Sequence, residues 1–266
     1  PALKGEAYMA VRTAQSKEAG RAPLPLTSRL DKWWIKPVLT VIVLGGFGLY
    51  SLWRAFENQF FEFGPYLTPF YSPEVPLEWE LAGWKISPAF YILVFPLSFR
   101  LTCYYYRLAY YRAFFLDPPA CAVSEPFPRK RYTGERRFPL ILQNLHRFAF
   151  YAAAIFIVIL SYDAIKAFFW EDGFHMGLGT LILIGNVLLL ALYTFSCHSF
   201  SHLIGGRLDC YSCSLVSKTR HGIWKQVSFL NSRHSLYAWA SLISVMVTDI
   251  YIRSVASGVI QDFRFF

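Results

Sequence analysis

The chain has 266 residues, of which 55% are hydrophobic, 19% aromatic and only 16% charged. A soluble domain carries about a quarter charged residues, so this composition excludes an ordinary soluble globular domain. The formal net charge is +9, but basic residues beside membrane spans explain such an excess. Neither an RNA-binding motif nor a glycine-rich phosphate loop accompanies the charge. We therefore expect an integral membrane protein that does not bind nucleic acid.

The apolar runs of the chain predict five transmembrane helices. Residues 1–32 are polar and basic, which predicts a cytoplasmic N-terminal arm ahead of a membrane domain over residues 33–266. Each span needs about 20 apolar residues. Such runs cover Trp34–Trp53, a stretch from Trp84 or Ser87 into the tyrosine-rich segment after Arg100, Ile141–Tyr162, Met176–Cys197 and Ser235–Arg253. The predicted fold is an all-α bundle of five membrane-spanning helices, and Pro96 predicts a kink in the second.

Loop charges predict the orientation. Lys and Arg are concentrated in the N-terminal arm, in the loop after the second span and in the loop after the fourth, and such residues favour the cytoplasmic side. The alternate loops are acidic and carry Glu57, Glu62, Glu74, Glu78, Glu80, Asp163, Glu171 and Asp172. We therefore expect a cytoplasmic N-terminus and an external C-terminus. Asp249 and Arg253, four residues apart in the fifth span, are expected to form an ion pair on the helix surface.

The segment from Cys197 to Cys213 concentrates residue types that bind metals. His198 and His202 lie four residues apart and share one helix face. Two glycines then permit a turn before Cys210 and Cys213, whose C-x-x-C spacing lets two thiolates reach one metal centre. These four residues predict a Rieske-type [2Fe–2S] cluster or a tetrahedral zinc site. Unliganded cysteines are the alternative, and Cys197 is a candidate to lie just behind the ligands.

Histidines gather at the predicted cytoplasmic ends of three spans, and they are His146, His198, His202 and His234. Facing imidazoles from two helices could ligate haem b, which is the competing cofactor. The outer side has only His175, so two haems are not expected. The predicted polar contacts of a quinone are Arg100, His146 and His234, because a quinone carbonyl needs hydrogen-bond donors in an apolar pocket. The alternative for Arg100 is a side chain that extends to the lipid headgroups.

Four long stretches carry a family resemblance: FPLSFRLTCYYYRLAYYRAFFLDPPACAV, RYTGERRFPLILQNLHRF, YTFSCHSFSHLIGGRLD and DIYIRSVASGVIQDFRFF. They resemble the membrane anchor subunit of actinobacterial succinate dehydrogenase, respiratory complex II, and the similarity runs from Trp33 to Phe266. The resemblance implies a multi-pass protein of the bacterial plasma membrane. It also implies partners: a cytoplasmic iron–sulfur subunit and, bound to that, a FAD flavoprotein subunit that oxidises succinate.

In such a complex, electrons pass from the iron–sulfur subunit to menaquinone or ubiquinone at the anchor. This chain has no catalytic nucleophile and no flavin motif, so it should not oxidise succinate alone. Relatives with one five-helix anchor carry two haems b on four histidines near both faces, a pattern from which this chain departs. The complex could form a higher oligomer. The alternative from another functional class is a structural or transport membrane protein with a zinc site.

Overall fold

The computed structural model describes residues 31–74, 79–81, 84–120, 123 and 134–265. The predicted N-terminal arm lies outside these residues apart from its last two. The chain divides into two compact units, one with residues 1–43 and 108–132, the other with residues 44–107 and 133–266. Helix α2 (Ile35–Glu57) and helix α4 (Tyr104–Phe114) each begin in one unit and end in the other. In the first unit, the ring of Tyr111 packs against those of Tyr110 and Phe115.

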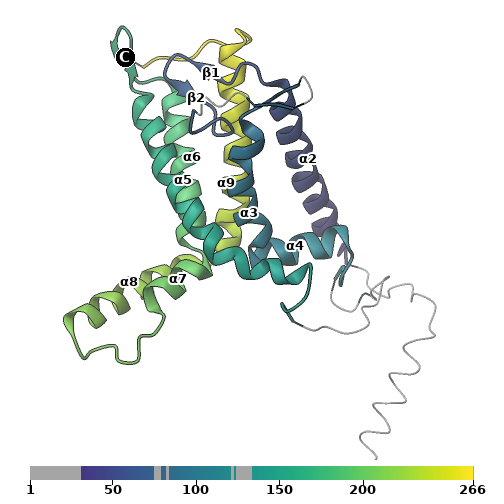
Figure 1. Ribbon diagram of the computed structural model, residues 1–266, viewed down its shortest axis with the longest axis vertical. Helices are drawn as coiled ribbons and strands as arrows, with labels where there is room; N and C mark the ends of the chain where they lie inside the picture. The colour runs from purple at the N-terminus through teal and green to yellow at the C-terminus, as the bar shows by residue number, and fades with distance from the viewer. Residues whose placement is uncertain (1–30, 75–78, 82–83, 121–122, 124–133, 266) are drawn as a thin grey trace, which may run out of the picture. The chain divides into compact units, whose positions relative to one another are not determined.

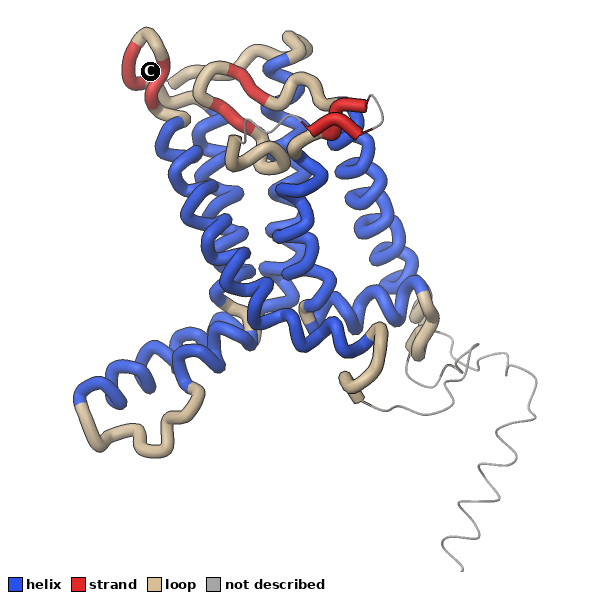
Figure 2. The backbone as a smooth tube through the Cα atoms, in the orientation of Figure 1, coloured by secondary structure: helices blue, strands red, loops and turns tan. Residues whose placement is uncertain are grey.

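The second unit combines antiparallel helices with three short strand hairpins (Figure 1). Its further elements are β1 (Glu62–Phe63), β2 (Tyr66–Leu67), β3 (Trp79–Leu81), β4 (Trp84–Ile86), α3 (Ala89–Thr102), the 3₁₀ helix η1 (Leu140–Leu145), α5 (His146–Lys166), β5 (Phe169–Trp170), β6 (Gly173–Phe174), α6 (Leu178–Phe195), α7 (His198–Gly205), α8 (Leu215–Asn231) and α9 (His234–Ala256). The strands pair in sequence order, with Glu62 opposite Leu67, Trp79 opposite Ile86 and Phe169 opposite Phe174. All three hairpins lie at one end of the helices (Figure 2).

Four helical segments are long and apolar enough to cross a membrane. They are Ile35–Glu57, Leu140–Lys166, Leu178–Phe195 and His234–Ala256, and they confirm the positions of the first, third, fourth and fifth predicted spans. Apolar side chains such as Ile155, Val158 and Leu188 are exposed along them. A helix whose outer surface contacts hydrocarbon can leave such side chains uncovered by protein. The chain is therefore a membrane-embedded, mainly helical protein.

The second predicted span differs from the prediction. Trp84–Ile86 is strand β4, and helix α3 begins only at Ala89. Its 14 residues span about 21 Å, less than the roughly 30 Å of a hydrocarbon core. The helix ends at Cys103, where the backbone is extended, and the chain resumes as α4. The expected continuous helix through the tyrosine-rich segment is therefore wrong, and the total of five spans stays a prediction.

The helices of the second unit pack against both neighbours and sequence-distant partners. Helix α6 packs along α9, α3 along α5, and α5 along α6. One cluster of buried side chains contains Ala55, Phe70, Tyr71, Ala89 and Val245, and another contains Tyr66, Ala164, Ala167, Leu183 and Ile252. Both clusters include residues of the loop between α2 and α3. That loop is therefore folded onto the ends of the helices.

The ion pair between Asp249 and Arg253 is buried, which corrects the expectation of a pair on the helix surface. The two side chains are 0% and 3% exposed, and the Arg253 Nε lies 2.9 Å from the Asp249 Oδ2. The Tyr50 hydroxyl donates to the same carboxylate at 2.6 Å. Arg253 also donates to the Glu57 carboxylate at 3.4 Å and to the Gln59 carbonyl. Because a buried charge needs partners, this network holds α9 against the end of α2.

The C-terminal segment is held at the start of α6 by Asp262. Its carboxylate accepts hydrogen bonds from the Tyr66 hydroxyl at 2.8 Å, the Tyr251 hydroxyl at 2.6 Å and the Gly179 amide at 3.1 Å. Gly179 lies in the first turn of α6, where the positive end of the helix dipole also favours an anion. Burial raises the pKa of Tyr66 to about 12, so its hydroxyl remains a donor at neutral pH.

We predict that Asp262→Ala destabilises the protein by about 2 kcal/mol, because hydrogen bonds to a charged group contribute roughly 1.5–3 kcal/mol and the buried Tyr66 hydroxyl loses its charged partner and keeps Thr180. The measurement is denaturant unfolding in detergent. Asp172→Ala is the matched control, since Asp172 is 61% exposed and its partners, His175 at 3.3 Å and Arg264 at 3.5 Å, lie near the surface. The Asp172→Ala variant should lose less than about 1 kcal/mol of stability. Equal losses in the two variants would contradict the role given to Asp262.

Candidate functional site

A cavity of about 360 Å³ lies at the end of the second unit that is opposite to the strand hairpins. Its wall is formed where α3 gives way to α4, at the start of α5, at the junction of α6 and α7, and where α8 leads into α9. The lining residues are Cys103, Tyr104, Tyr105, His146, Cys197, His198, Asn231, Ser232, His234 and Ser235. Segments that are far apart in sequence thus meet around one space that is rich in sulfur and imidazole.

Two buried cysteines each face a histidine in this wall. Cys103 and Cys197 are the free cysteines of the described chain, with side chains 3% and 1% exposed. The Cys103 Sγ lies 3.4 Å from the His234 Nε2, and the Cys197 Sγ lies 3.0 Å from the His146 Nε2. Burial raises the pKa of the Cys197 thiol to about 12. Cys197 is therefore a neutral thiol that can donate to the imidazole.

The protonation of His146 follows from its other neighbours. The Thr102 hydroxyl lies 2.9 Å from the His146 Nδ1 and gives its own proton to the Ser98 carbonyl at 2.6 Å. The hydroxyl oxygen can therefore only accept from the imidazole, which places the ring proton on Nδ1. The ring also stacks on Phe99, with centroids 4.9 Å apart. The lone pair of Nε2 is consequently directed at Cys197 and the cavity.

His234 has a matching environment. The Ser196 hydroxyl lies 2.7 Å from the His234 Nδ1 and donates to the Tyr193 carbonyl at 3.1 Å. Its oxygen therefore accepts the Nδ1 proton, and the Nε2 lone pair is directed at Cys103. The imidazole stacks on the Tyr193 ring at 5.0 Å. A hydroxyl behind each ring and an aromatic face beside it fix both imidazoles in the form that ligates metals.

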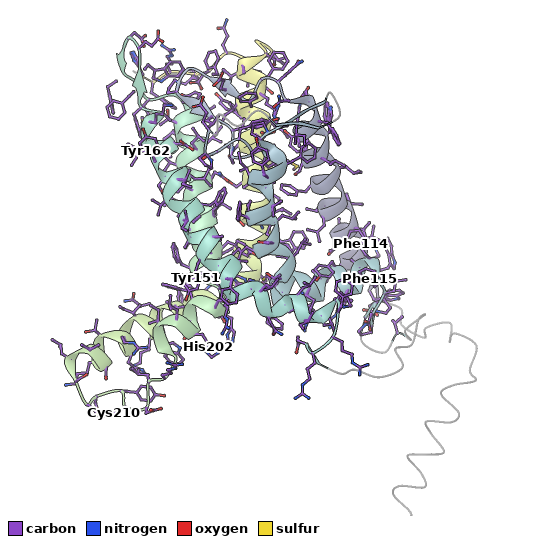
Figure 3. All side chains as sticks on the ribbon, in the orientation of Figure 1. Phe114, Phe115, Tyr151, Tyr162, His202 and Cys210 are labelled. Carbon is purple, nitrogen blue, oxygen red and sulfur yellow. A yellow bond between two sulfur atoms is a disulfide. The ribbon has the colours of Figure 1, made fainter. Side chains whose placement is uncertain are left out.

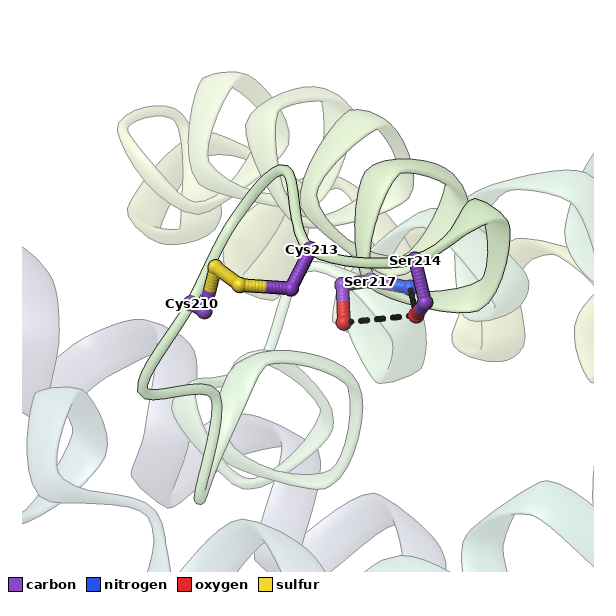
Figure 4. The surroundings of a disulfide bond; sticks show 4 residues. All are labelled: Cys210, Cys213, Ser214 and Ser217. Carbon is purple, nitrogen blue, oxygen red and sulfur yellow. Dashed lines mark hydrogen bonds between the residues drawn. A yellow bond between two sulfur atoms is a disulfide. The ribbon is translucent and has the colours of Figure 1, made fainter.

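The four predicted metal ligands are not brought together. Cys210 and Cys213 form a disulfide in the loop between α7 and α8 (Figure 4). His198 and His202 do share a face of α7, with ring centroids 4.7 Å apart. His202 on α7 and Cys210 in the loop after it lie apart from each other (Figure 3). Across the described residues, no three His, Cys, Asp or Glu side chains are arranged to hold a single metal ion. Cys197, predicted to lie behind the ligands, faces His146 instead.

Arg100 turns into the helices and lies outside the cavity lining. Its guanidinium donates to the Tyr106 hydroxyl at 2.8 Å, the Ala238 carbonyl at 3.2 Å and the Ser241 hydroxyl at 3.1 Å. It also lies 4.7 Å from the centre of the Tyr193 ring. These contacts tie α3 to α9 and to the start of α4. The Arg100 side chain therefore does not extend to the lipid headgroups, which was the alternative expected from the sequence.

Sequence reasoning passed over Cys103 and gave Cys197 a lesser role. Cys103 has no metal-binding motif around it, because its histidine neighbour is 131 residues away in sequence. Cys197 and His146 are 51 residues apart. The available signal was that both cysteines, like both histidines, lie at helix ends.

The sequence matches the family of actinobacterial succinate dehydrogenase subunit SdhC over residues 35–258. The chain belongs to this family. A chain of the solved Mycobacterium smegmatis Sdh1 complex in the apo form is similar to this SdhC-family protein, with 49% identity and a TM-score of 0.81. The match covers 92% of this chain and 97% of that one. A search of curated proteins finds no match. The predicted family is thus confirmed, and the chain is a membrane anchor subunit of succinate dehydrogenase.

We predict that Cys103 and Cys197 do not react with a maleimide in the folded protein, because their thiols are buried, and that both react after denaturation. Mass spectrometry of the individual peptides measures the labelling. Leu215→Cys is the control for an accessible thiol, since Leu215 is 80% exposed. Cys210 and Cys213 should be labelled only after a reductant is added. Labelling of native Cys103 or Cys197 at the rate of the control would contradict the buried site.

Proposed function

We propose that this SdhC-family anchor binds an iron–sulfur subunit and a flavoprotein subunit, and passes electrons from succinate oxidation to a membrane quinone. We further propose that it carries a [2Fe–2S] cluster, with Cys103, Cys197, His146 and His234 as ligands in place of the set expected from sequence spacing. One observation carries this proposal: two buried cysteine–histidine pairs, Cys103 with His234 and Cys197 with His146, line a single cavity. The chain is not catalytic on its own.

The donor set fits a cluster with two irons. Each iron of a [2Fe–2S] centre takes two protein ligands, and Rieske centres use two histidines and two cysteines in total. Such a centre needs four donors around a space, whereas a zinc ion needs them around one point. The donors at the cavity come as two Cys–His pairs, an arrangement that suits two irons better than a single zinc ion. The hydroxyls of Thr102 and Ser196 supply the support that metal-bound imidazoles receive from their other nitrogen.

A bound cluster would supply one-electron transfer, and Rieske centres, in which two histidines ligate one iron, have potentials between roughly −150 and +300 mV, a range suited to quinones. The residues of the chain contribute binding and orientation. Cys103 and Cys197 lose their protons when they bind metal. His146 and His234 present Nε2 lone pairs without any change of tautomer, since Nδ1 already donates to a hydroxyl.

Haem b and a directly bound quinone explain the geometry less well. A haem needs two imidazole nitrogens that face each other across the iron, but here each Nε2 faces a cysteine sulfur. A quinone carbonyl needs a donor, and an Nε2 without a proton only accepts. His146 and His234 therefore act on quinone through the cluster in this proposal. Arg100, the third predicted quinone contact, supports the site by positioning α4 and α9.

We predict that Cys103→Ser and Cys197→Ser each remove two irons and two sulfides per complex and slow quinone reduction, while succinate-to-dye activity persists. Iron and sulfide assays with electron paramagnetic resonance provide the measurement. Cys210→Ser and Cys213→Ser are matched controls and should keep the wild-type iron content. Loss of iron in Cys210→Ser and Cys213→Ser, with normal iron in Cys103→Ser and Cys197→Ser, would instead support the ligands predicted from the sequence. A wild-type complex with a reducible haem band and no excess iron would remove the cluster.

We predict that Thr102→Val and Ser196→Ala weaken cluster retention by about 10- to 100-fold, the usual effect of losing a partner of a metal-bound histidine. The measurement is the rate of iron loss to a chelator. Thr248→Val is the control, because Thr248 is also a buried hydroxyl that donates within its helix, to the Ser244 carbonyl at 2.8 Å. Iron loss that is equally fast in all three variants would show a general loss of stability instead.

We predict that a tag on this chain recovers both soluble subunits in mild detergent, because the family is a subunit of succinate dehydrogenase. Peptide mass spectrometry and flavin fluorescence identify the iron–sulfur protein and the FAD protein. Recovery of this chain alone at full yield would contradict the proposed assembly.

A further inference from the structure

Helices α7 and α8 form a hairpin that runs across the direction of α5 and α6 (Figure 1). Helix α7 starts three residues after α6 ends, and α8 ends three residues before α9 starts. Both ends of the hairpin are therefore tethered to the ends of membrane spans. The two helices pack closely, because a Cβ on Gly205 would lie only 2.4 Å from the Trp224 side chain. Arg220 donates to the Ile204 carbonyl at 2.9 Å and closes the hairpin.

A row of apolar side chains lies along α8, next to the side that faces α7. Val216, Ile223 and Leu230 recur every seven residues and so form one line along the helix. Val216 is 67% exposed and Ile223 is 41% exposed. Arg220 and Trp224, which face α7, lie next to this row, because Arg220 follows Val216 by four residues. No part of the described chain covers the outer half of this apolar row.

The opposite side of α8 carries two lysines and the exposed ring of Phe229, which follows Lys225 by four residues and packs against Arg233. Lys218 and Lys225 are exposed, and each follows a member of the apolar row by two residues, which is about 200° around a helix. Residues 198–233 contain five basic side chains and one acidic side chain, a formal charge of +4 with histidines neutral. The basic residues are Arg207, Lys218, Arg220, Lys225 and Arg233, and the acidic residue is Asp209. Apolar and cationic sides on one helix are typical of a helix that lies in a membrane interface.

We infer that the α7–α8 hairpin lies in the headgroup layer of an anionic leaflet, with Val216 and Ile223 among the acyl chains. The tethers to α6 and α9 keep the hairpin at the membrane boundary, and α8 is absent from the helices apolar enough to span. A basic cluster beside a span attracts anionic lipid headgroups. Lys218 and Lys225 lie in water and headgroups on the far side. The occupant of the apolar row is thus phospholipid rather than a protein partner.

The test places a benzoylphenylalanine cross-linker at residue 223 or residue 225 of the full complex in vesicles that contain phosphatidylglycerol. Ile223→benzoylphenylalanine should yield lipid adducts by mass spectrometry, several-fold more than Lys225→benzoylphenylalanine on the opposite side. Succinate-to-dye activity and complex recovery verify that both variants are assembled. A protein adduct at residue 223, equal lipid adducts at both residues or no adduct at residue 223 would each overturn the inference.

A second measurement tests the preference for anionic lipid. Lys218→Gln with Lys225→Gln should lower the phosphatidylglycerol that copurifies with the complex by about twofold or more, because two cations near the headgroups are lost. Lys166→Gln is the control, because Lys166 lies at the end of α5 that is far from the hairpin. It should leave the amount of copurifying phosphatidylglycerol unchanged. Unchanged phosphatidylglycerol in the double variant would overturn the anionic preference.

Discussion

Polar groups in a membrane-embedded bundle must find their partners within the protein, because hydrocarbon offers none. The second unit meets this constraint with connected sets of polar side chains instead of isolated pairs. One set joins Asp249 and Arg253 to Tyr50 and Glu57. Another surrounds Asp262 at the start of α6. Both sets join segments that are distant in sequence, so satisfying the buried polar groups also fixes how the helices pack.

The same constraint shapes the cavity at the other end of the helices. Each imidazole there uses both nitrogens, with a hydroxyl on Nδ1 and a thiol on Nε2. The hydroxyls are in turn satisfied by carbonyls of their own helices. No rearrangement of the rings is needed for Nε2 to bind a metal. A site whose supporting hydrogen bonds already exist holds its ligands close to the geometry that they need.

Sequence patterns predicted the elements of the fold better than its contacts. Runs of about 20 apolar residues are a direct consequence of bilayer thickness, so four spans were found within a few residues of their ends. The end of α3 was missed because neither glycine nor proline marks Cys103; its contacts with α9 override helix propensity. The i, i+4 spacing of Asp249 and Arg253 predicted a pair but could not reveal its burial, which depends on α2.

The predicted ligand set and the cavity differ for a related reason. Local spacing favoured His198, His202, Cys210 and Cys213, since residues close in sequence can reach one metal centre without help from the fold. The cavity instead draws its donors from four segments. Only the packing of α3, α5, α6 and α9 makes them neighbours, and no local motif encodes that packing.

The position of Arg100 adds an electrostatic argument to the proposed cluster. Burial raises the pKa of the Cys103 thiol, and the Arg100 charge offsets this rise only slightly. The fixed cation acts toward the thiolate, which is the form that metal binding requires. Tyr106, Ala238 and Ser241 hold the guanidinium in place. A cation beside an electron carrier also stabilises its reduced form, because reduction adds negative charge. Under the proposed function, Arg100 would thereby favour electron arrival at the anchor.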